Sequence, residues 1–265
     1  MQSISSFYHI FRMVFRWTLQ SIIFLGSSQF WAVEHDLFNE LLGKYVNSGK
    51  VNYSGIQRES RERLDVYLDL LSRINLEQFI NSTESEQLAV YINAYNAFTI
   101  TAVLDHWPVE SIRDIPNVWK EKKYKLGHNL VSLDEIEHKF ARSFGDPRIH
   151  FALNCASVGC PELRSEAYIA VNLDEQLEDQ TLLFFRQKDK FVSCFECKDI
   201  QLSKIFEWFH QDFHSRSYPF TKKYGKFSGV MGFIYDYSQS KMKRRIKRNI
   251  IPLTFLNYDW SINSE

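Results

Sequence analysis

The chain has 265 residues, of which 45% are hydrophobic and 24% are charged. These proportions are those of an ordinary globular protein, and a chain of this length can bury enough surface to fold without a metal or a disulfide. Its 32 basic residues are balanced by 32 acidic ones. This neutrality argues against a dedicated nucleic-acid-binding protein, which would carry a clear basic excess.

The amino terminus has the pattern of a secretory signal. Arg12 and Arg16 precede an uncharged run over residues 17–33, and a charged start with a short apolar centre is typical of exported proteins. The run contains several polar side chains and is short for a membrane span, which needs about 20 apolar residues. We therefore expect a signal peptide at 1–32, a single domain at 33–265, and export to the periplasm or outside the cell. An uncleaved anchor and a buried helix are the alternatives.

Beyond residue 33 the spacing of apolar side chains mostly predicts helices. Thr83 lies three residues before Glu86, and Ser132 lies three residues before Glu135. Both pairs have the spacing of a capping box. The helix that starts after Thr83 is apolar nearly all round and stops at Pro108, so we expect it to be central. The expected helices cover residues 35–49 (ended by Gly49), 61–71, 82–108, 132–145 (ended by Gly145), 172–185 (capped by Asn172) and 203–213.

Strands are fewer. Residues 190–202 are predicted to form a short hairpin or two brief strands, and the terminal segment 250–263 is β-like. The stretch 148–155, RIHFALNC, reads as a buried strand. These patterns predict an α+β fold: a single, mostly helical domain whose small sheet includes 148–155 and the carboxyl-terminal strand. The basic run 241–248 fits a solvated face better than a lipid or nucleic-acid contact.

Four reactive side chains lie close together in the chain, at His150, Asn154, Cys155 and Cys160. In a strand, His150 and Asn154 share one face and Cys155 points to the other. This disfavours a simple Cys155–His150 pair of nucleophile and base. The face of His150 and Asn154 lines either a pocket or a buried hydrogen-bond network.

Cys160 precedes Pro161, a residue favoured at the first position of a helix. As the N-cap of such a helix, Cys160 would have a stabilised thiolate. Cys155 and Cys160 could instead form a disulfide in an oxidising compartment, or either could be a nucleophile served by an imidazole from elsewhere. Zinc held together with Cys194 and Cys197 is a weaker alternative, because the spacing of 155 and 160 is loose. A redox dithiol is disfavoured, since such pairs are usually two residues apart. We expect no metal and no cofactor.

Asn93 and Asn96 are three apart on the predicted central helix and are therefore neighbours on its surface. Buried amides need partners, because each unpaired buried polar group costs about 1–3 kcal/mol. They either tie the helix to loop backbone or line a pocket with His150 and Asn154. His138 is a candidate base for a cysteine, although a lone helical histidine more often packs or lies at the surface.

Several segments together closely resemble the uncharacterised family catalogued as domain of unknown function 547. They occur in the same order, and the resemblance covers almost everything from residue 37 to residue 263. The segments are YVNSGKVNYSGI, LAVYINAYNAFTI, SIRDI, LVSLDEIEHKFAR, DPRIHFALNCASVGCPELRSEAY, LSKIFEWFHQDF and YDWSIN. The resemblance implies a shared fold and no established activity. Bacterial members often carry export signals, and plant members place the domain behind a coiled-coil-like segment, which suggests interactions there. The Cys194–Cys197 pair is not part of the family pattern.

Two functions follow as hypotheses. The first is an exported thiol-dependent hydrolase or acyl transferase, whose candidate residues are the nucleophiles Cys155 and Cys160, the orienting His150 and Asn154, and the substrate contacts Asn93, Asn96 and His138. The second is a non-catalytic binding or interaction module with a structural Cys155–Cys160 disulfide. Either would act on an unknown substrate or protein partner. Nucleic acid is not expected, and membrane contact is expected only through an uncleaved amino-terminal segment.

Export is tested by the intact mass of the protein purified from its native host. We expect the mature chain to lack about 25–35 residues, the usual length of a signal. A full-length amino terminus on protein from the cytoplasm would contradict the prediction.

Overall fold

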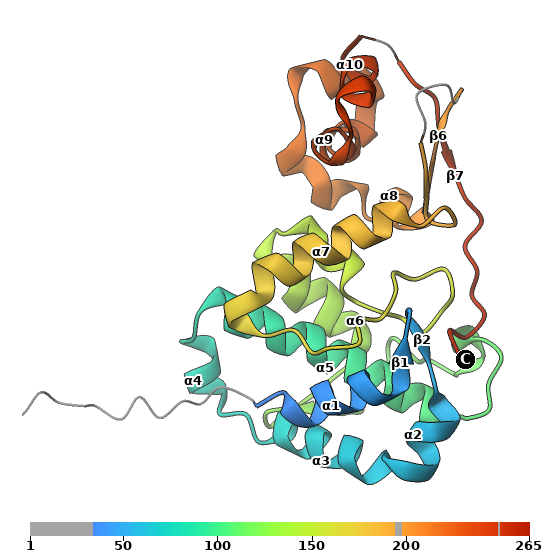
Figure 1. Cartoon of the computed structure of the whole chain (residues 1–265). Coiled ribbons are helices and arrows are strands. Elements are labelled where there is room, and N and C mark those ends of the chain that lie inside the picture. The colour runs from blue at the N-terminus through green and yellow to red at the C-terminus, as the bar shows by residue number, and fades with distance from the viewer. Residues whose placement is uncertain (1–33, 194–197, 249) are drawn as a thin grey trace, which may run out of the picture. The chain divides into compact units, whose positions relative to one another are not determined.

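The computed structural model describes residues 34–193, 198–248 and 250–265 (Figure 1). The expected signal peptide and the pair Cys194 and Cys197 lie outside these described residues. Residues Ala32–Glu265 form one compact unit.

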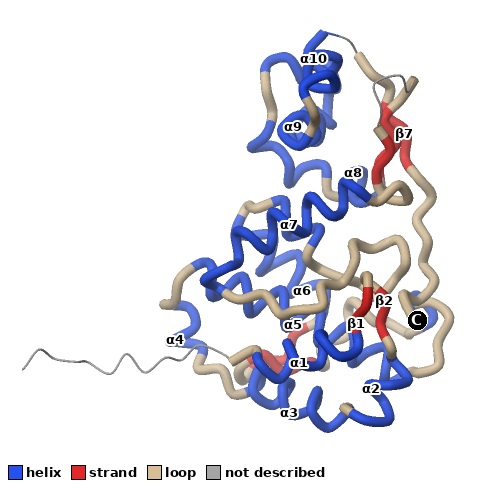
Figure 2. The backbone as a smooth tube through the Cα atoms, in the orientation of Figure 1, coloured by secondary structure: helices blue, strands red, loops and turns tan. Residues whose placement is uncertain are grey.

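The described chain is mostly helical, with small antiparallel or mixed sheets of two or three strands (Figure 2). This confirms the predicted α+β class. The α-helices are α1 (Asp36–Tyr45), α2 (Tyr53–Glu59), α3 (Arg61–Ser72), α4 (Leu76–Ile80), α5 (Glu84–Asp105), α6 (Leu133–Glu135), α7 (Leu173–Arg186), α8 (Lys204–Trp208), α9 (Ser228–Tyr237) and α10 (Ser240–Arg248). The strands are β1 (Val46–Asn47), β2 (Lys50–Val51), β3 (Tyr124–Leu126), β4 (Asn129–Val131), β5 (Phe191–Val192), β6 (Ile200–Leu202) and β7 (Leu253–Phe255).

Shorter helical turns connect these elements. The π-helix η2 spans Ile136–Phe140. The 3-10 helices are η1 (Ile112–Asp114), η3 (Ala141–Phe144), η4 (Pro147–Phe151), η5 (Ala170–Asn172), η6 (His210–Arg216) and η7 (Pro219–Phe227).

Helix α5 is the buried centre of its part of the fold, as its apolar sequence predicted. Thr83 and Glu86 form both bonds of the capping box at its start, and nearly every side chain from Leu88 to Leu104 is buried. Within the described ranges, no helix combines the length and the apolar character that a membrane crossing requires.

Two asparagines tie α5 to the loops beside it. The Asn93 amide donates to the carbonyl of Tyr168 at 2.7 Å and accepts from the Tyr168 N–H at 2.9 Å. Asn96 does the same for the loop at residues 152–154. It donates to the Ala152 carbonyl at 3.0 Å and accepts from the Asn154 N–H at 2.8 Å. Each side chain therefore satisfies one backbone donor and one backbone acceptor in the interior.

The second capping box also forms, between Ser132 and Glu135. From there α6 continues as the π-helix η2 and the 3-10 helix η3, and ends at Gly145 with φ 71°. A π turn inserts an extra residue into the helical repeat and often marks a functional site. Here it changes which side chains of 136–140 share a face.

The predicted strand at 148–155 is wrong. Residues Pro147–Phe151 form the 3-10 helix η4, in which Asp146 accepts from the N–H of Arg148 and Pro147 occupies the first turn. An aspartate cap followed by proline starts a helical turn, and this local signal outweighs the apolar alternation that follows it. The argument that a pleat separates His150 from Cys155 therefore does not apply.

The predicted helix that would begin at Pro161, with Cys160 as its N-cap, is also absent. Residues 161–169 are irregular, because side chains of other elements take up their backbone groups. Asn154 donates to the carbonyl of Pro161, and Gln180 donates to that of Glu162. Cys160 is therefore not the N-cap of a helix at 161–169.

Two predicted helices are shorter than expected. The first ends at Tyr45, and Gly49, with φ 76°, lies instead in the turn between β1 and β2. The helix predicted at 203–213 is divided at Phe209 into α8 and η6. Asn172 stands at the N-cap of α7 but makes no side-chain cap bond.

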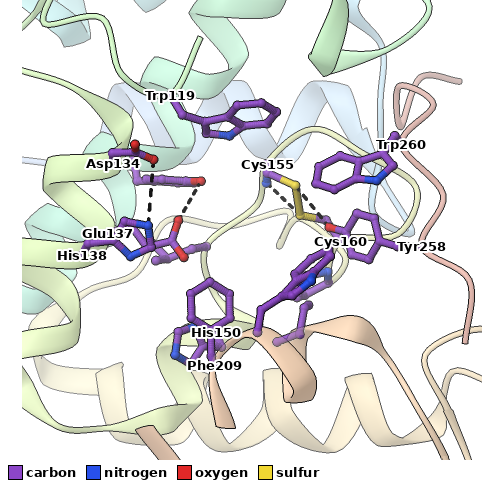
Figure 3. Close-up of a pocket in the computed structure, with 15 residues that line it drawn as sticks. Trp119, Asp134, Glu137, His138, His150, Cys155, Cys160, Phe209, Tyr258 and Trp260 are labelled. Carbon is purple, nitrogen blue, oxygen red and sulfur yellow. Dashed lines mark hydrogen bonds and ion pairs between the residues drawn. A yellow bond between two sulfur atoms is a disulfide. The ribbon is translucent and has the colours of Figure 1, made fainter. Parts of the chain in front are cut away.

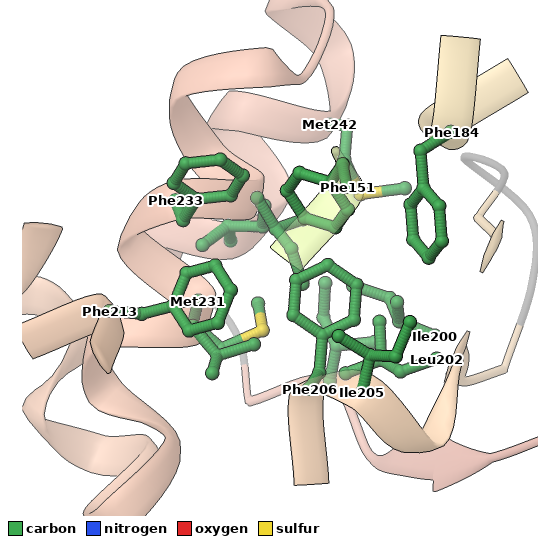
Figure 4. Packing of buried hydrophobic residues seen from close by; sticks show 14 residues of the cluster. Phe151, Phe184, Ile200, Leu202, Ile205, Phe206, Phe213, Met231, Phe233 and Met242 are labelled. Carbon is green, nitrogen blue, oxygen red and sulfur yellow. The ribbon is translucent and has the colours of Figure 1, made fainter. Parts of the chain in front are cut away.

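The predicted hairpin and carboxyl-terminal strand are confirmed in one sheet. Strand β6 pairs antiparallel with β5 and parallel with β7. Against this sheet packs an aromatic-rich core (Figure 4), in which Phe151 of η4 contacts Phe184 of α7 and Phe206 of α8. This core fixes η4 relative to α8 and η6, and thereby places His150.

Replacing Asn93 with leucine should destabilise the fold. The variant would leave the N–H and carbonyl of Tyr168 buried without partners, at about 1–3 kcal/mol for each group. Chemical denaturation measures the loss, with Asn129→Leu, at an exposed strand position, as the control. Equal midpoints for Asn93→Leu and the wild type would contradict the structural role of this amide.

Candidate functional site

A pocket with a cavity volume of about 230 Å³ lies where distant segments meet (Figure 3). We call it the aromatic pocket. One part of its lining consists of rings, from Tyr95, Trp119, Trp208, Phe209, Tyr258 and Trp260. The other part carries the ionisable side chains Asp134, Glu137, His138 and His150 and the sulfur atoms of Cys155 and Cys160.

Three of the rings, those of Trp119, Trp208 and Tyr258, pack around Trp260. Its ring lies 4.5 Å from that of Tyr258 and 5.8 Å from that of Trp208, measured between centroids. Trp119 meets it edge-on at 6.0 Å, and the Arg113 guanidinium lies 5.4 Å from its centroid. Rings supported in this way offer firm apolar faces to a ligand.

Glu137 is the central ionisable group. It lies in the π-helix η2, and its carboxylate accepts a hydrogen bond from the Tyr95 hydroxyl at 3.3 Å. Burial raises the pKa of Glu137 to about 7, with a further rise from the Asp134 carboxylate, while the Tyr95 bond acts in the opposite direction. Glu137 therefore changes protonation near neutral pH, as groups at functional sites often do.

His150 is buried and is held by a partly buried ionic network. Its Nε2 lies 2.7 Å from Asp212, which Arg142 binds in bidentate fashion at 2.6 and 2.7 Å. Burial lowers the pKa of His150 despite the Asp212 bond. Burial opposes the ionisation of Asp212, but the His150 and Arg142 bonds hold its pKa well below the usual range. We therefore assign a neutral imidazole whose Nε2–H donates to an ionised Asp212.

His138 lies at the edge of the same network. Its Nδ1 is 3.1 Å from Arg142, and its Nε2 is 3.9 Å from Asp134. Burial lowers the pKa of His138, and the positive charge of Arg142 lowers it further. The exposed imidazole is therefore neutral at pH 7 and can accept or donate a hydrogen bond in the pocket.

Cys155 and Cys160 are joined by a disulfide. The Cys155 N–H donates to the Cys160 sulfur at 2.9 Å, and the half-buried Cys155 sulfur lies 3.1 Å from the Ser157 hydroxyl and 3.3 Å from the Tyr258 hydroxyl. Of the alternatives left open by the sequence, the disulfide is the one present. Within the described residues no three potential ligands gather into a metal-binding group, and Cys194 and Cys197 lie outside them.

The carboxyl terminus holds the disulfide loop in place. The N–H groups of Val158 and Gly159 donate to the carbonyls of Ser261 and Asp259. A Cβ on Gly159 would lie 2.8 Å from that Asp259 oxygen, so only glycine allows this approach. The terminus is thereby docked, and it carries Tyr258 and Trp260 into the pocket.

The structure brings together four of the seven predicted site residues, namely His138, His150, Cys155 and Cys160. Asn93, Asn96 and Asn154 do not line the aromatic pocket. Asn154 donates to the Pro161 carbonyl at 2.7 Å and accepts from the Ala156 N–H at 2.8 Å, so all three amides are engaged with backbone. A substrate contact by these amides remains a prediction.

Sequence reasoning missed several pocket residues. Asp134 and Glu137 were not predicted, although Asp134 lies three residues before Glu137 and four before the predicted His138, a helical spacing that could have identified one polar face. The tryptophans carry no comparable local signal, because Trp119, Trp208 and Trp260 lie on three separate segments. Asp212 is 62 residues from its partner His150.

Glu137→Gln should change how stability depends on pH. Because the folded-state pKa is about 7 and the usual value is 4.5, the folded state retains a proton that the unfolded state loses in this window. Glu137 therefore makes the free energy of unfolding fall as the pH rises from about 4.5 to 7. Above that range it no longer changes this free energy with pH. The difference in free energy of unfolding between Glu137→Gln and wild type should shift in favour of the variant by on the order of 2–3 kcal/mol as the pH rises from 5 to 8. Denaturation at both pH values measures this, with exposed Glu62→Gln as the control; parallel profiles for Glu137→Gln and wild type would contradict it.

The comparisons with known proteins concern the middle of the chain. Residues 79–185 match a family described as "Protein of unknown function, DUF547". No curated protein and no solved structure matches the chain. The matched segment runs from α4 through nearly all of α7 and contains Glu137, His150 and both cysteines of the disulfide. Trp208 and Trp260 lie outside it. Over residues 79–185 the match thus supports the resemblance to the uncharacterised DUF547 family that is seen in the sequence.

Proposed function

We propose that this chain is a binding module that holds one saccharide unit, or a similar ring with hydroxyl groups, in the aromatic pocket. The observation that carries the proposal is that Tyr258 and Trp260 form a wall of rings on one side of the pocket, while the opposite wall carries the ionisable groups of Asp134, Glu137 and His138 (Figure 3). A sugar ring has an apolar C–H face and a polar edge, so it matches both walls at once. Small-ligand sites in general combine apolar lining with a few placed polar groups.

The polar wall can bind hydroxyl groups in two ways. A protonated Glu137 donates a hydrogen bond, and an ionised Glu137 only accepts. The neutral His138 imidazole offers one donor and one acceptor. Because the pKa of Glu137 is about 7, both forms of the carboxyl are populated near neutral pH, and affinity should vary with pH in this range.

The covalent state of the site supports binding over thiol catalysis in the oxidised protein. Both sulfur atoms are used in the disulfide. The Nε2 of His150 is directed to Asp212 and is not available to a cysteine. Disulfides persist in oxidising compartments, so this bond also supports the proposal, drawn from the amino-terminal sequence, that the protein is exported.

Ligand binding can be measured by tryptophan fluorescence, since Trp119, Trp208 and Trp260 all line the pocket. We expect N-acetylglucosamine or glucose oligomers to change the emission and to saturate. Trp208→Ala should weaken binding at least tenfold by removing a ring face, with little loss of stability, because this side chain is 46% exposed. Trp107→Phe is the control, since Trp107 packs on Tyr53 and does not line the pocket. Saturable binding of indole but of no saccharide would contradict the ligand class.

A second candidate is a thiol-dependent hydrolase or acyl transferase that becomes active on reduction. One observation favours it: Cys155 lines the pocket beside two hydroxyl groups, so its free thiol would face a bound ligand. Its thiolate would attack an acyl carbon, form a thioester and release the leaving group with a proton. Water or an acceptor hydroxyl would then take the acyl group and restore the thiol.

Alkylation tests both states. Unreduced protein should resist iodoacetamide at positions 155 and 160 and yield a linked Cys155–Cys160 peptide by mass spectrometry. After mild reduction, the half-buried Cys155 should react before the buried Cys160. A reduced protein that shows no acyl–enzyme burst with p-nitrophenyl acetate, or a burst that survives in Cys155→Ala, would exclude the thiol enzyme. Saccharide binding by the oxidised form would be unaffected by either result.

A further inference from the structure

Basic charge is concentrated in one part of this neutral chain. Residues 213–248 contain ten Lys or Arg residues and a single acidic residue, Asp236. They form η6, η7, α9 and α10, of which α9 and α10 lie side by side (Figure 1). This excess is independent of the aromatic pocket.

Helix α10 divides its two kinds of side chain between opposite faces. Met242 and Ile246, four residues apart, are buried, while Arg244, Lys247 and Arg248 are exposed. At 100° per residue these three basic positions lie on the side opposite the buried pair. The helix therefore presents a basic face to solvent.

The neighbouring element η7 extends this face. The ammonium of Lys223 donates to the carbonyls of Ile246 at 2.7 Å and Lys247 at 3.2 Å. This contact fixes η7 against the carboxyl-terminal end of α10. Its neighbours Lys222 and Lys226 are exposed. We call Lys222, Lys226, Arg244, Lys247 and Arg248 the basic surface.

Little negative charge compensates the basic surface. Asp236 is engaged by the Tyr218 hydroxyl at 2.7 Å and lies 3.7 Å from Arg216. Lys247 lies over the rings of Phe220 and Tyr235 at 5.4 and 5.3 Å, contacts that keep its charge. Within the described residues, no acidic side chain pairs with the five members of the surface. Clustered like charges repel one another, and a polyanion relieves this repulsion.

We propose that the basic surface docks onto a membrane that contains anionic lipid. Ile250 follows α10 closely and is 68% exposed, and the half-buried rings of Phe220 and Tyr224 lie among the lysines of η7. Basic side chains combined with an exposed apolar one fit the interface between headgroups and acyl chains. A nucleic acid would use the charges but would leave Ile250 without a role. This proposal replaces the interpretation of 241–248 as a merely solvated face and adds a membrane contact that does not involve the amino terminus.

The test is sedimentation of the full chain with vesicles of phosphatidylcholine, with and without 30% phosphatidylserine. The variant Arg244→Gln, Lys247→Gln, Arg248→Gln removes three charges from the exposed face of α10. Each basic residue near an anionic surface contributes roughly fivefold in affinity, so we expect a loss on the order of 100-fold on anionic vesicles. The matched control, Lys50→Gln, Lys125→Gln, Lys188→Gln, removes three exposed charges elsewhere and should bind like wild type.

Ile250→Ser separates lipid from other polyanions. It should weaken binding to anionic vesicles and leave retention on heparin unchanged, because only the bilayer offers an apolar phase. The proposal is overturned if the triple α10 variant binds anionic vesicles as wild type does, if wild type shows no preference for phosphatidylserine, or if a DNA duplex binds more tightly than vesicles and Ile250→Ser binds vesicles normally. Unchanged melting temperatures confirm that the variants are folded.

Discussion

The buried pairing of Asn93 and Asn96 with loop backbone is the constraint on which the candidate site depends. Helix α5 has no polar face, so the loops at 152–154 and 167–168 would meet it with unsatisfied N–H and carbonyl groups. Each asparagine supplies one donor and one acceptor at the required place. Because an unpaired buried group is costly, the loops have one favoured position on the helix. That position sets where the disulfide begins.

The disulfide loop is then enclosed from the other side by the end of the chain. The carbonyls of Asp259 and Ser261 accept from the loop, and Tyr258 and Trp260 are brought against Cys155 and Trp208. Without the loop in place, the Tyr258 hydroxyl would lose its contacts with Cys155 and Ser157. The pocket thus depends on contacts between segments that lie far apart in sequence. No single helix, strand or loop supplies all of its lining residues.

The neighbouring carboxyl groups of Asp212 and Glu137 have pKa values that are shifted in opposite directions. Asp212 is bound by a guanidinium and an imidazole N–H, and its charged form is favoured. Among the described residues, the Tyr95 hydroxyl is the hydrogen-bond partner of Glu137. Burial and the nearby carboxylates of Asp134 and Asp212 favour its neutral form. The consequence is a pocket with one permanent ionic network and one carboxyl that titrates near neutrality. Such a separation of pKa values suits hydrogen bonding to an uncharged ligand.

The sequence alone determined the features that rest on local interactions. Such features act within a few residues of the chain. The capping boxes at Thr83 and Ser132 correctly predicted two helix starts, and Gly145 correctly predicted a helix end. The apolar sequence of α5 correctly predicted its burial. The prediction of a strand at 148–155 was wrong because the Asp146–Pro147 cap starts a helical turn there. The prediction of a helix after Cys160 was wrong because Asn154 and Gln180, from other segments, hydrogen-bond to that backbone. The disulfide stayed one of several alternatives, since spacing permits a bond without requiring it. Only the tertiary structure decided that Glu137, Asp212 and Trp260 belong to one site, because their proximity depends on long-range packing that no local pattern records.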